Sequence, residues 1–276
     1  MKQNRKKNRV AGTIFLILLI MIVVSPFYVM VVGTFKPTIE LIKTPIDLKP
    51  FTKFTLKNIN TVLQKSDVFL WLKNSLVISL TVAFSTVFIG VSAGYAFAKI
   101  QFRGKVLFFS LVIATMLMPK QMLMIPNYLV ARSLHLQNSL IGVILTSISP
   151  AFGVFLSRQQ ISSLPEELFD AAEIDGCGEL KKFFSVMLPI TLPTVGTIAI
   201  LSFFATFNDY VWQSIMISNK NIRTLPIGLS YFTQLQVNNR GAQLAMSFIA
   251  TLPLIILFIL CQNFFIKGAT SGAVKG

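Results

Sequence analysis

Long runs of apolar residues constrain this chain more than any other feature of its sequence. A helix that crosses a hydrocarbon core about 30 Å thick needs roughly 20 mostly apolar residues. Five such runs contain no Asp, Glu, Lys or Arg, at residues 10–32, 76–98, 139–157, 190–207 and 244–266. The chain is 54% hydrophobic and 13% charged, whereas soluble proteins are about 25% charged. The sequence therefore predicts an all-α, polytopic membrane protein.

A sixth candidate span is interrupted by Pro119, Lys120 and Gln121. The freed backbone groups and the Lys120 ammonium need polar partners that hydrocarbon lacks. The segment is therefore either a kinked span, or a helix that ends near Pro119 at the outer surface with Lys120 reaching water. We expect one transmembrane domain over residues 1–276, with six spans at about 10–32, 76–98, 106–130, 139–157, 190–212 and 244–266.

Basic residues indicate the orientation of these spans. Five of them, between Lys2 and Arg9, precede the first span and predict a cytoplasmic N-terminus. Six spans then return the C-terminus to the same side. The basic start also fits a signal peptide, but the apolar run is too long and lacks a small-x-small cleavage site, which favours an uncleaved span. The formal charge of +15 is scattered over short loops, which indicates anionic lipid headgroups and no nucleic-acid partner.

The inside loop, residues 158–189, holds six of the ten acidic residues of the chain. Ser163 and Glu166 have the spacing of a capping box, which predicts that a helix begins there. The glycines at 176 and 178 predict its end. An apolar stripe is expected at i, i+4, i+7 and i+8, formed by Leu164, Leu168, Ala171 and Ala172.

The acidic residues of this helix help to decide whether it contacts a membrane surface or a protein. Helices that lie on anionic membranes usually carry Lys and Arg on the polar face, whereas this one carries acids such as Glu167, Asp170 and Asp175. A short stripe with two adjacent alanines lets another protein approach closely. The pattern therefore favours a helix that docks a protein partner.

At this loop the sequence resembles a known family. The run Asp170-Ala171-Ala172-Glu173-Ile174-Asp175-Gly176, followed after nine residues by Val186-Met187-Leu188-Pro189, resembles the EAA loop of permeases in binding-protein-dependent ABC importers. Asp170 stands where the family pattern has Glu, and Val186 where it has Ile. Further segments are similar to carbohydrate-uptake permeases of the maltose type: Met118 to Tyr128, Phe207 to Trp212, Thr224 to Leu229, and Gly272 to Gly276.

The resemblance implies the ABC importer permease fold, with six transmembrane helices and a cytoplasmic coupling-helix loop in a bacterial cell membrane. It implies half of a translocation pathway for a carbohydrate. The implied partners are a second homologous permease, two ABC ATPase subunits and an extracytoplasmic solute-binding protein. An ABC permease for another solute and a stand-alone carrier are the alternatives.

The same resemblance implies two contacts with the ATPase subunits. One is the loop helix, through Leu168, Asp170, Ala171, Ala172, Glu173, Asp175 and Gly176. The other is the tail, through Gly272, Ala273, Val274, Lys275 and Gly276, which enters the interface between the ATPases. From composition alone, the tail fits equally a basic end held near headgroups.

The energy source is expected in a partner chain. Ion-coupled carriers keep acids or histidines within the membrane, and this chain has almost none there. A phosphate-binding Gly-x-x-x-x-Gly-Lys-Ser/Thr loop is missing from the sequence, so ATP and Mg are expected on the partner ATPases and no cofactor on this chain. An enzyme is disfavoured, because no cluster of His, Cys, Asp and Glu has ligand or acid/base spacing.

Two further features remain open in the sequence. Asn208, Asp209 and Trp212 cluster near the outer end of the fifth span, where they fit either a sugar site or an interfacial Trp anchor with polar neighbours. Gly90 and Gly94 form a Gly-x-x-x-Gly step that permits close helix packing, either inside the subunit or against another subunit.

Overall fold

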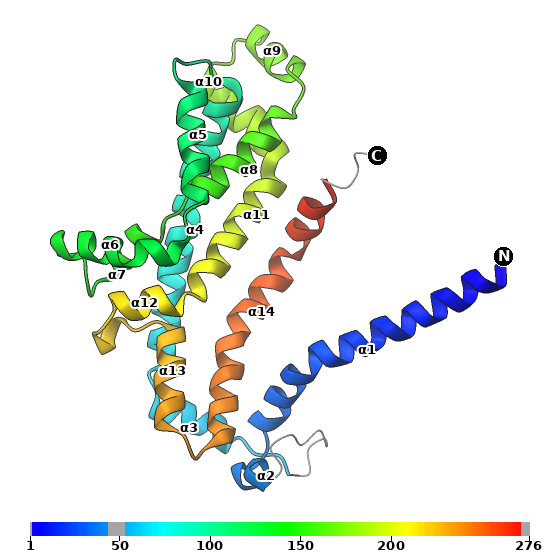
Figure 1. Ribbon diagram of the computed structural model, residues 1–276, viewed down its shortest axis with the longest axis vertical. Helices are drawn as coiled ribbons and strands as arrows, with labels where there is room; N and C mark the ends of the chain where they lie inside the picture. The colour runs from blue at the N-terminus through cyan, green and yellow to red at the C-terminus, as the bar shows by residue number, and fades with distance from the viewer. Residues whose placement is uncertain (1, 44–52, 272–276) are drawn as a thin grey trace. The chain divides into compact units, whose positions relative to one another are not determined.

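The computed structural model describes residues 2–43 and 53–271, with side chains described for residues 12–39, 41 and 53–262. All regular elements of these residues are helical, which confirms the all-α class (Figure 1). In chain order they are α1 (Lys2–Thr34), α2 (Thr38–Lys43), α3 (Lys57–Lys65), α4 (Val68–Lys99), α5 (Lys105–Met116), α6 (Lys120–Ser133), α7 (Leu140–Ser147), α8 (Ala151–Ser162), α9 (Glu167–Ile174), α10 (Glu179–Lys181), the π-helix η1 (Lys182–Met187), α11 (Leu188–Phe207), α12 (Tyr210–Met216), the 3₁₀ turn η2 (Lys220–Ile222), α13 (Leu225–Leu235) and α14 (Arg240–Ser271).

Four described helical segments are long and apolar enough to cross a membrane: Gly12–Thr34, Val68–Lys99, Glu179–Phe207 and Arg240–Gln262. Two bent helix pairs raise the number to as many as six if each pair is one span. These pairs are α5 with α6 and α7 with α8. Length and composition therefore allow the predicted number of spans within the described part of the chain.

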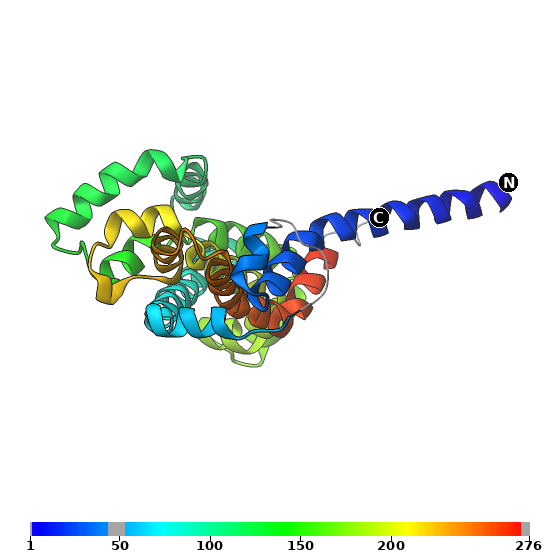
Figure 2. The same cartoon turned by 90° about the horizontal axis from the view of Figure 1, so that it is seen from below.

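The interruption at Pro119 is a true break in the structure. Pro119 has an extended backbone, and the axes of α5 and α6 differ by 101°. In Figure 2, the blue-green α5 is seen end-on while the green α6 lies in the plane of the view. A milder break of 43° separates α7 from α8, next to Pro150, and the sequence analysis did not anticipate it.

The chain divides into two compact units, which are described separately. The first comprises residues 1–68 and 228–253. Its centre is the buried Asn58 of α3, whose side-chain amide donates to the carbonyls of Thr34 at 2.9 Å and Lys36 at 2.7 Å. Because the last carbonyls of a helix have no partner within the helix, Asn58 satisfies the end of α1 and fixes α3 beside it.

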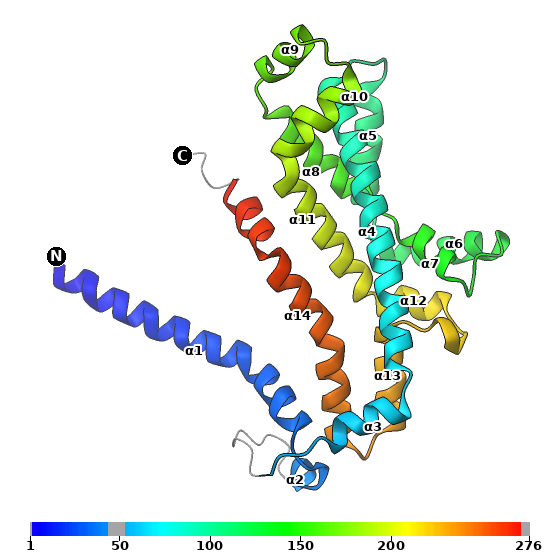
Figure 3. The same ribbon diagram turned by 180° about the vertical axis from the view of Figure 1, so that it is seen from behind.

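The second unit comprises residues 69–227 and 254–276. Within it α4, α5, α8 and α11 run side by side (Figures 1 and 3). A Cβ added at Gly90 would lie 3.0 Å from Cα of Gly153, and one added at Gly94 would lie 2.5 Å from Cβ of Ser157. The glycine step therefore lets α4 approach α8 within the subunit, which confirms the internal-packing reading.

The end of this unit that carries residues 158–189 has a core of its own. Its buried members come from five elements and meet beneath α9; they are Val91, Tyr95, Ile161, Phe169, Met187 and Ile198. The loop that carries the EAA-like motif is therefore packed onto the span ends and is not a free linker.

Candidate functional site

Helix α9 carries the EAA-like motif, but it begins later than the capping-box spacing predicts. It starts at Glu167, and Glu166 caps it without a side-chain hydrogen bond. Ser163 instead ends α8, where its hydroxyl donates to the carbonyl of Gln160 at 2.7 Å. The capping-box prediction is wrong because the preceding helix already uses the serine.

The apolar residues of α9 fall on two faces and do not form the single predicted stripe. Phe169 and Ala172, three residues apart, are buried at 5% and 7% exposure. Leu168, Ala171 and Ile174 are exposed, Ile174 at 87%. Since residues three apart share a helix face, the first pair anchors α9 and the second set is free for a partner. Sequence analysis missed Phe169, although its i+3 spacing from Ala172 was a usable signal.

The end of α9 follows the predicted glycine stop. Gly176 has a φ of +75°, a region in which glycine has no steric penalty. The backbone N–H of Cys177 donates to the carbonyl of Ala172, and that of Gly176 donates to Glu173, both at 2.9 Å. These bonds resemble a Schellman motif, which satisfies the last carbonyls of a helix. A Cβ at Gly176 would meet no atom within 4 Å, so its constraint is conformational and not steric.

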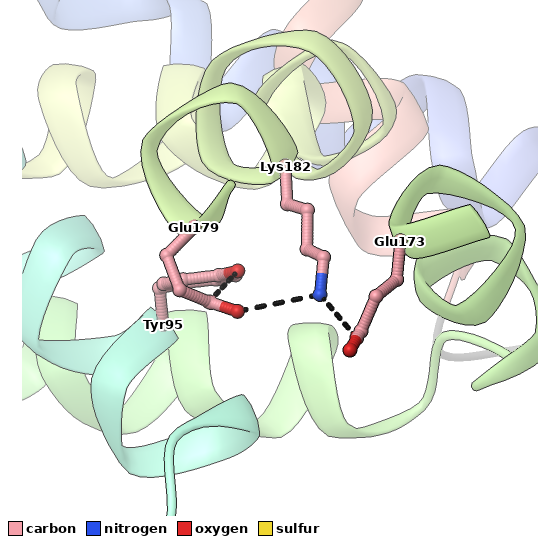
Figure 4. Close-up of polar contacts among 4 residues, drawn as sticks. All are labelled: Tyr95, Glu173, Glu179 and Lys182. Carbon is pink, nitrogen blue, oxygen red and sulfur yellow. Dashed lines mark hydrogen bonds and ion pairs between the residues drawn. The ribbon is translucent and has the colours of Figure 1, made fainter. Parts of the chain in front are cut away.

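A chain of polar contacts joins α9 to the start of the fifth span and to α4 (Figure 4). The ammonium of Lys182 donates to Oε2 of Glu173 at 2.7 Å and to Oε1 of Glu179 at 3.3 Å. The other carboxylate oxygen of Glu179 accepts a hydrogen bond from the hydroxyl of Tyr95 at 2.8 Å. Four side chains from α9, η1, α10 and α4 therefore form one continuous network.

The opposite end of α9 is also tied to α4. The ammonium of Lys99 lies 3.0 Å from Oε1 of Glu166 and 4.2 Å from the centre of the Phe169 ring. It also donates to the carbonyl of Leu164 at 3.4 Å. A cation over an aromatic face is attracted by the ring quadrupole, so Lys99 holds both the cap and the buried anchor of α9.

The charge of Lys182 alters the titration of its partner in α9. Its hydrogen bond and positive charge hold the pKa of Glu173 below the ordinary value of 4.5. Glu173 is therefore ionised near neutral pH. Sequence analysis placed Glu173 on the docking helix but did not identify Lys182, Tyr95 or Lys99 as its supports, since each contact depends on packing.

A second candidate region is a cavity of about 420 Å³ within the second unit, and ligand pockets commonly measure about 300–1,000 Å³. Three helix junctions border it: those of the bent pairs α5–α6 and α7–α8, and the turn between α11 and α12. Broken spans at membrane depth are tolerated where they line a polar or water-filled space. Its polar and aromatic lining comprises Thr115, Lys120, Asn127, Thr146, Ser147, Ser149, Phe152, Asp209 and Trp212.

The structure places two of the three predicted pathway residues on this cavity. Asp209 caps α12, and Trp212 is buried with its indole N–H donating to Oγ1 of Thr146 at 3.0 Å. Asn208 is exposed, does not line the cavity, and donates to the carbonyl of Phe204 at 3.0 Å. Trp212 thus forms part of the cavity wall, and Lys120 joins it from the broken third span. The predicted tail contacts, residues 272–276, lie outside the described residues.

Comparisons with known proteins identify the family of the chain. Residues 86–269 match the family described as binding-protein-dependent transport system inner membrane component. The chain is 35% identical to the arabinooligosaccharides transport system permease protein AraQ of Bacillus subtilis, over 97% of this chain and 96% of that one. It is 36% identical to AraQ of Halalkalibacterium halodurans, over 92% of each chain.

A solved structure shares the fold. It is a chain of a bacterial ABC transporter involved in the import of the acidic polysaccharide alginate. The TM-score is 0.83 at 18% identity, and the match covers 94% of this chain and 97% of that chain. At this identity the likeness concerns the fold alone.

Proposed function

Because the chain belongs to the family of binding-protein-dependent transport system inner membrane components, we propose that it is a permease subunit of an ABC importer for a carbohydrate. The curated relatives named above transport arabinooligosaccharides, which supports an oligosaccharide as the cargo. The family consists of membrane components of transport systems, and the apolar helices fit a multi-pass protein.

The observation that carries the proposal is that α9 is fixed to the subunit by one buried face and exposes the other. Leu168 and Ala171 are exposed, as are the acidic Asp170 and Asp175, while the buried Phe169 holds α9 in place. A small apolar surface with acidic flanks on a fixed helix suits a protein partner with a complementary basic rim. We assign this face to the ATPase subunits, which hold ATP and Mg.

Family membership implies ATPase and solute-binding partners, and the full assembly extends that statement. We assign a second homologous permease as the other half of the pathway, with two ATPase subunits on the cytoplasmic side. The loop that contains α9 then lies in the cytoplasm together with both termini. The tail, Gly272 to Gly276, reaches the interface between the two ATPases.

The cavity at the three helix junctions is assigned to the carbohydrate pathway. Hydroxyl groups of a sugar need donors and acceptors, which Asp209, Asn127 and Thr146 offer, and an aromatic wall, which Trp212 offers. Asn208 was predicted with them; its exposed side chain lies beyond the cavity and is assigned to the approach. The importer is favoured over a stand-alone carrier because the chain belongs to a family of binding-protein-dependent transport components.

Reconstitution tests the proposal directly. The chain is purified alone and with its partner permease and ATPases, and each preparation is placed in vesicles with the solute-binding protein outside. We expect labelled oligosaccharide uptake from the complete assembly with ATP inside, and none from the chain alone. Uptake by the chain alone, driven by a proton or sodium gradient, would overturn the assignment.

Growth of a deletion strain on a panel of solutes tests the cargo. We expect loss of growth on one or more oligosaccharides and unchanged growth on amino acids, peptides and monosaccharides. Loss confined to a non-sugar solute would contradict the carbohydrate assignment while leaving the permease assignment in place.

A further inference from the structure

Helix α4 is linked to both ends of α9 through two residues that lie one helical turn apart, directly by Lys99 and through a chain of polar contacts by Tyr95. Tyr95 and Lys99 are four residues apart, so their side chains share one face of α4. Lys99 contacts the beginning of α9 through Glu166 and Phe169. Tyr95 reaches the end of α9 through Glu179, Lys182 and Glu173 (Figure 4).

The two sides of these ion pairs differ in burial. The lysine side chains are nearly covered, at 7% exposure for Lys99 and 9% for Lys182. Their carboxylate partners on the α9 side are open to water, at 73% for Glu166 and 72% for Glu173. A covered lysine side chain has little freedom to turn its charge to another partner, whereas an exposed carboxylate can turn to water. Each lysine is therefore the buried member of its ion pair, and it holds α9 through the exposed carboxylate of Glu166 or Glu173.

Aromatic packing adds stiffness to the same junction. The Tyr95 ring lies edge-on to Phe183 of η1, with centroids 5.3 Å apart, and 6.5 Å from the ring of Phe169. Such pairs hold a relative orientation as well as a distance. A helix attached at one end can pivot, whereas one attached at both ends must carry its support along.

We propose that Tyr95 and Lys99, with Lys182 as the bridge, are positioning residues that make α9 and the loop end of α4 move as one body. The proposal rests on the assignment of α9 as the ATPase-docking helix. Displacement of α9 by the ATPase is then delivered to the second span through α4, and to the fifth span through η1 and α11. Neither transfer needs a contact between the ATPase and the spans themselves.

The test uses the complete assembly with its binding protein and compares four variants with two control variants. Tyr95→Phe removes one hydroxyl from the network and keeps the ring. Lys99→Met and Lys182→Met each remove one ammonium group, and the double variant Lys99→Met/Lys182→Met removes both. Lys182→Arg is the conservative partner. Lys181→Met is the matched control, because Lys181 is the exposed neighbour of Lys182. ATPase co-purification, ATP hydrolysis and oligosaccharide uptake are measured on each.

We expect ATPase to co-purify with every variant. Substrate transported per ATP hydrolysed should fall by about tenfold in the double variant and by less in each single one, a size typical of coupling between sites. Lys182→Arg and Lys181→Met should keep the ratio of the unmodified assembly. An unchanged ratio in the double variant with ATPase bound would overturn the proposal. Failure of the unmodified chain to bind ATPase would instead overturn the docking assignment.

Discussion

The carboxylate of Asp209 accepts a hydrogen bond from the backbone N–H of Trp212 at 3.1 Å. This is the N-cap of α12, and it places an acid and an aromatic ring together on the cavity wall. Asp209 therefore has two roles: it caps the start of α12, and its carboxylate faces a solute in the cavity.

Substitution of Asp209 separates these roles, because Asn caps a helix as well as Asp does. Asp209→Asn should keep thermal stability and raise the KM for oligosaccharide uptake by about tenfold, since a hydrogen bond to a charged group contributes about 1.5 kcal/mol or more. Asp209→Ala should also lose about 1 kcal/mol of stability through the missing cap. Wild-type uptake by Asp209→Asn in vesicles would remove the carboxylate from the pathway.

The two alanines of the motif should behave differently, although they are adjacent. Ala171 is exposed, so Ala171→Arg should leave a stable subunit that reaches the membrane but does not retain the ATPase. Ala172 is buried, so Ala172→Arg places a bulky charge in a packed site. It should lower the free energy of unfolding of the subunit itself by several kcal/mol. Membrane yield, melting temperature and ATPase co-purification distinguish them. Equal outcomes for the two variants would contradict the division of α9 into two faces.

Gly176 should tolerate residues according to their backbone preference and not their size. Its φ of +75° costs a residue with a Cβ roughly 1–2 kcal/mol, and Asn accepts this region more readily than most. Gly176→Ala should therefore loosen the end of α9 and reduce ATPase retention, whereas Gly176→Asn should resemble the natural chain. Hydrogen exchange at the Cys177 amide reports the loosening. A larger loss with Asn than with Ala would contradict the conformational explanation.

The contact between Glu173 and Lys182 should depend on acid pH. Because the folded-state pKa of Glu173 is lowered from 4.5, the ion pair contributes stability above that value and loses it as pH falls through the lowered pKa. The carbon-13 shift of the Glu173 carboxyl in labelled protein should titrate below pH 4.5. Lys182→Met should move this titration upward, while Lys181→Met should not. No movement in Lys182→Met would show that Lys182 is not the cause.

Deletion of Gly272 to Gly276 tests the tail contact. Four small residues and Lys275 suit a narrow crevice between two ATPase subunits, and a headgroup tether would be redundant with other basic inside loops. The truncated subunit should assemble with its partners but lose hydrolysis of ATP stimulated by the loaded binding protein. Retained stimulation and uptake would favour the headgroup tether.

Local chemistry in the sequence determined the helical class, the apolar runs of spanning length, the break at Pro119 and the glycine stop at Gly176. Each of these depends on a single segment and its solvent: uncharged runs partition into lipid, proline lacks a backbone N–H, and glycine accepts a positive φ. The acidic EAA-like loop also supplied the family resemblance. These features could be read without knowing any contact between distant residues.

The tertiary structure decided which face of α9 remains free and what holds the other. Leu168, Phe169, Ala171 and Ala172 are all compatible with an apolar stripe, but packing buries only Phe169, in the core with α4, α8, η1 and α11, and Ala172. The same holds for Lys182, whose partners come from α9 and α10, and for the cavity, whose lining residues come from three helix junctions far apart in the sequence. Face selection, charge pairing and cavity formation are set by packing between segments far apart in the chain, so no local pattern specifies them.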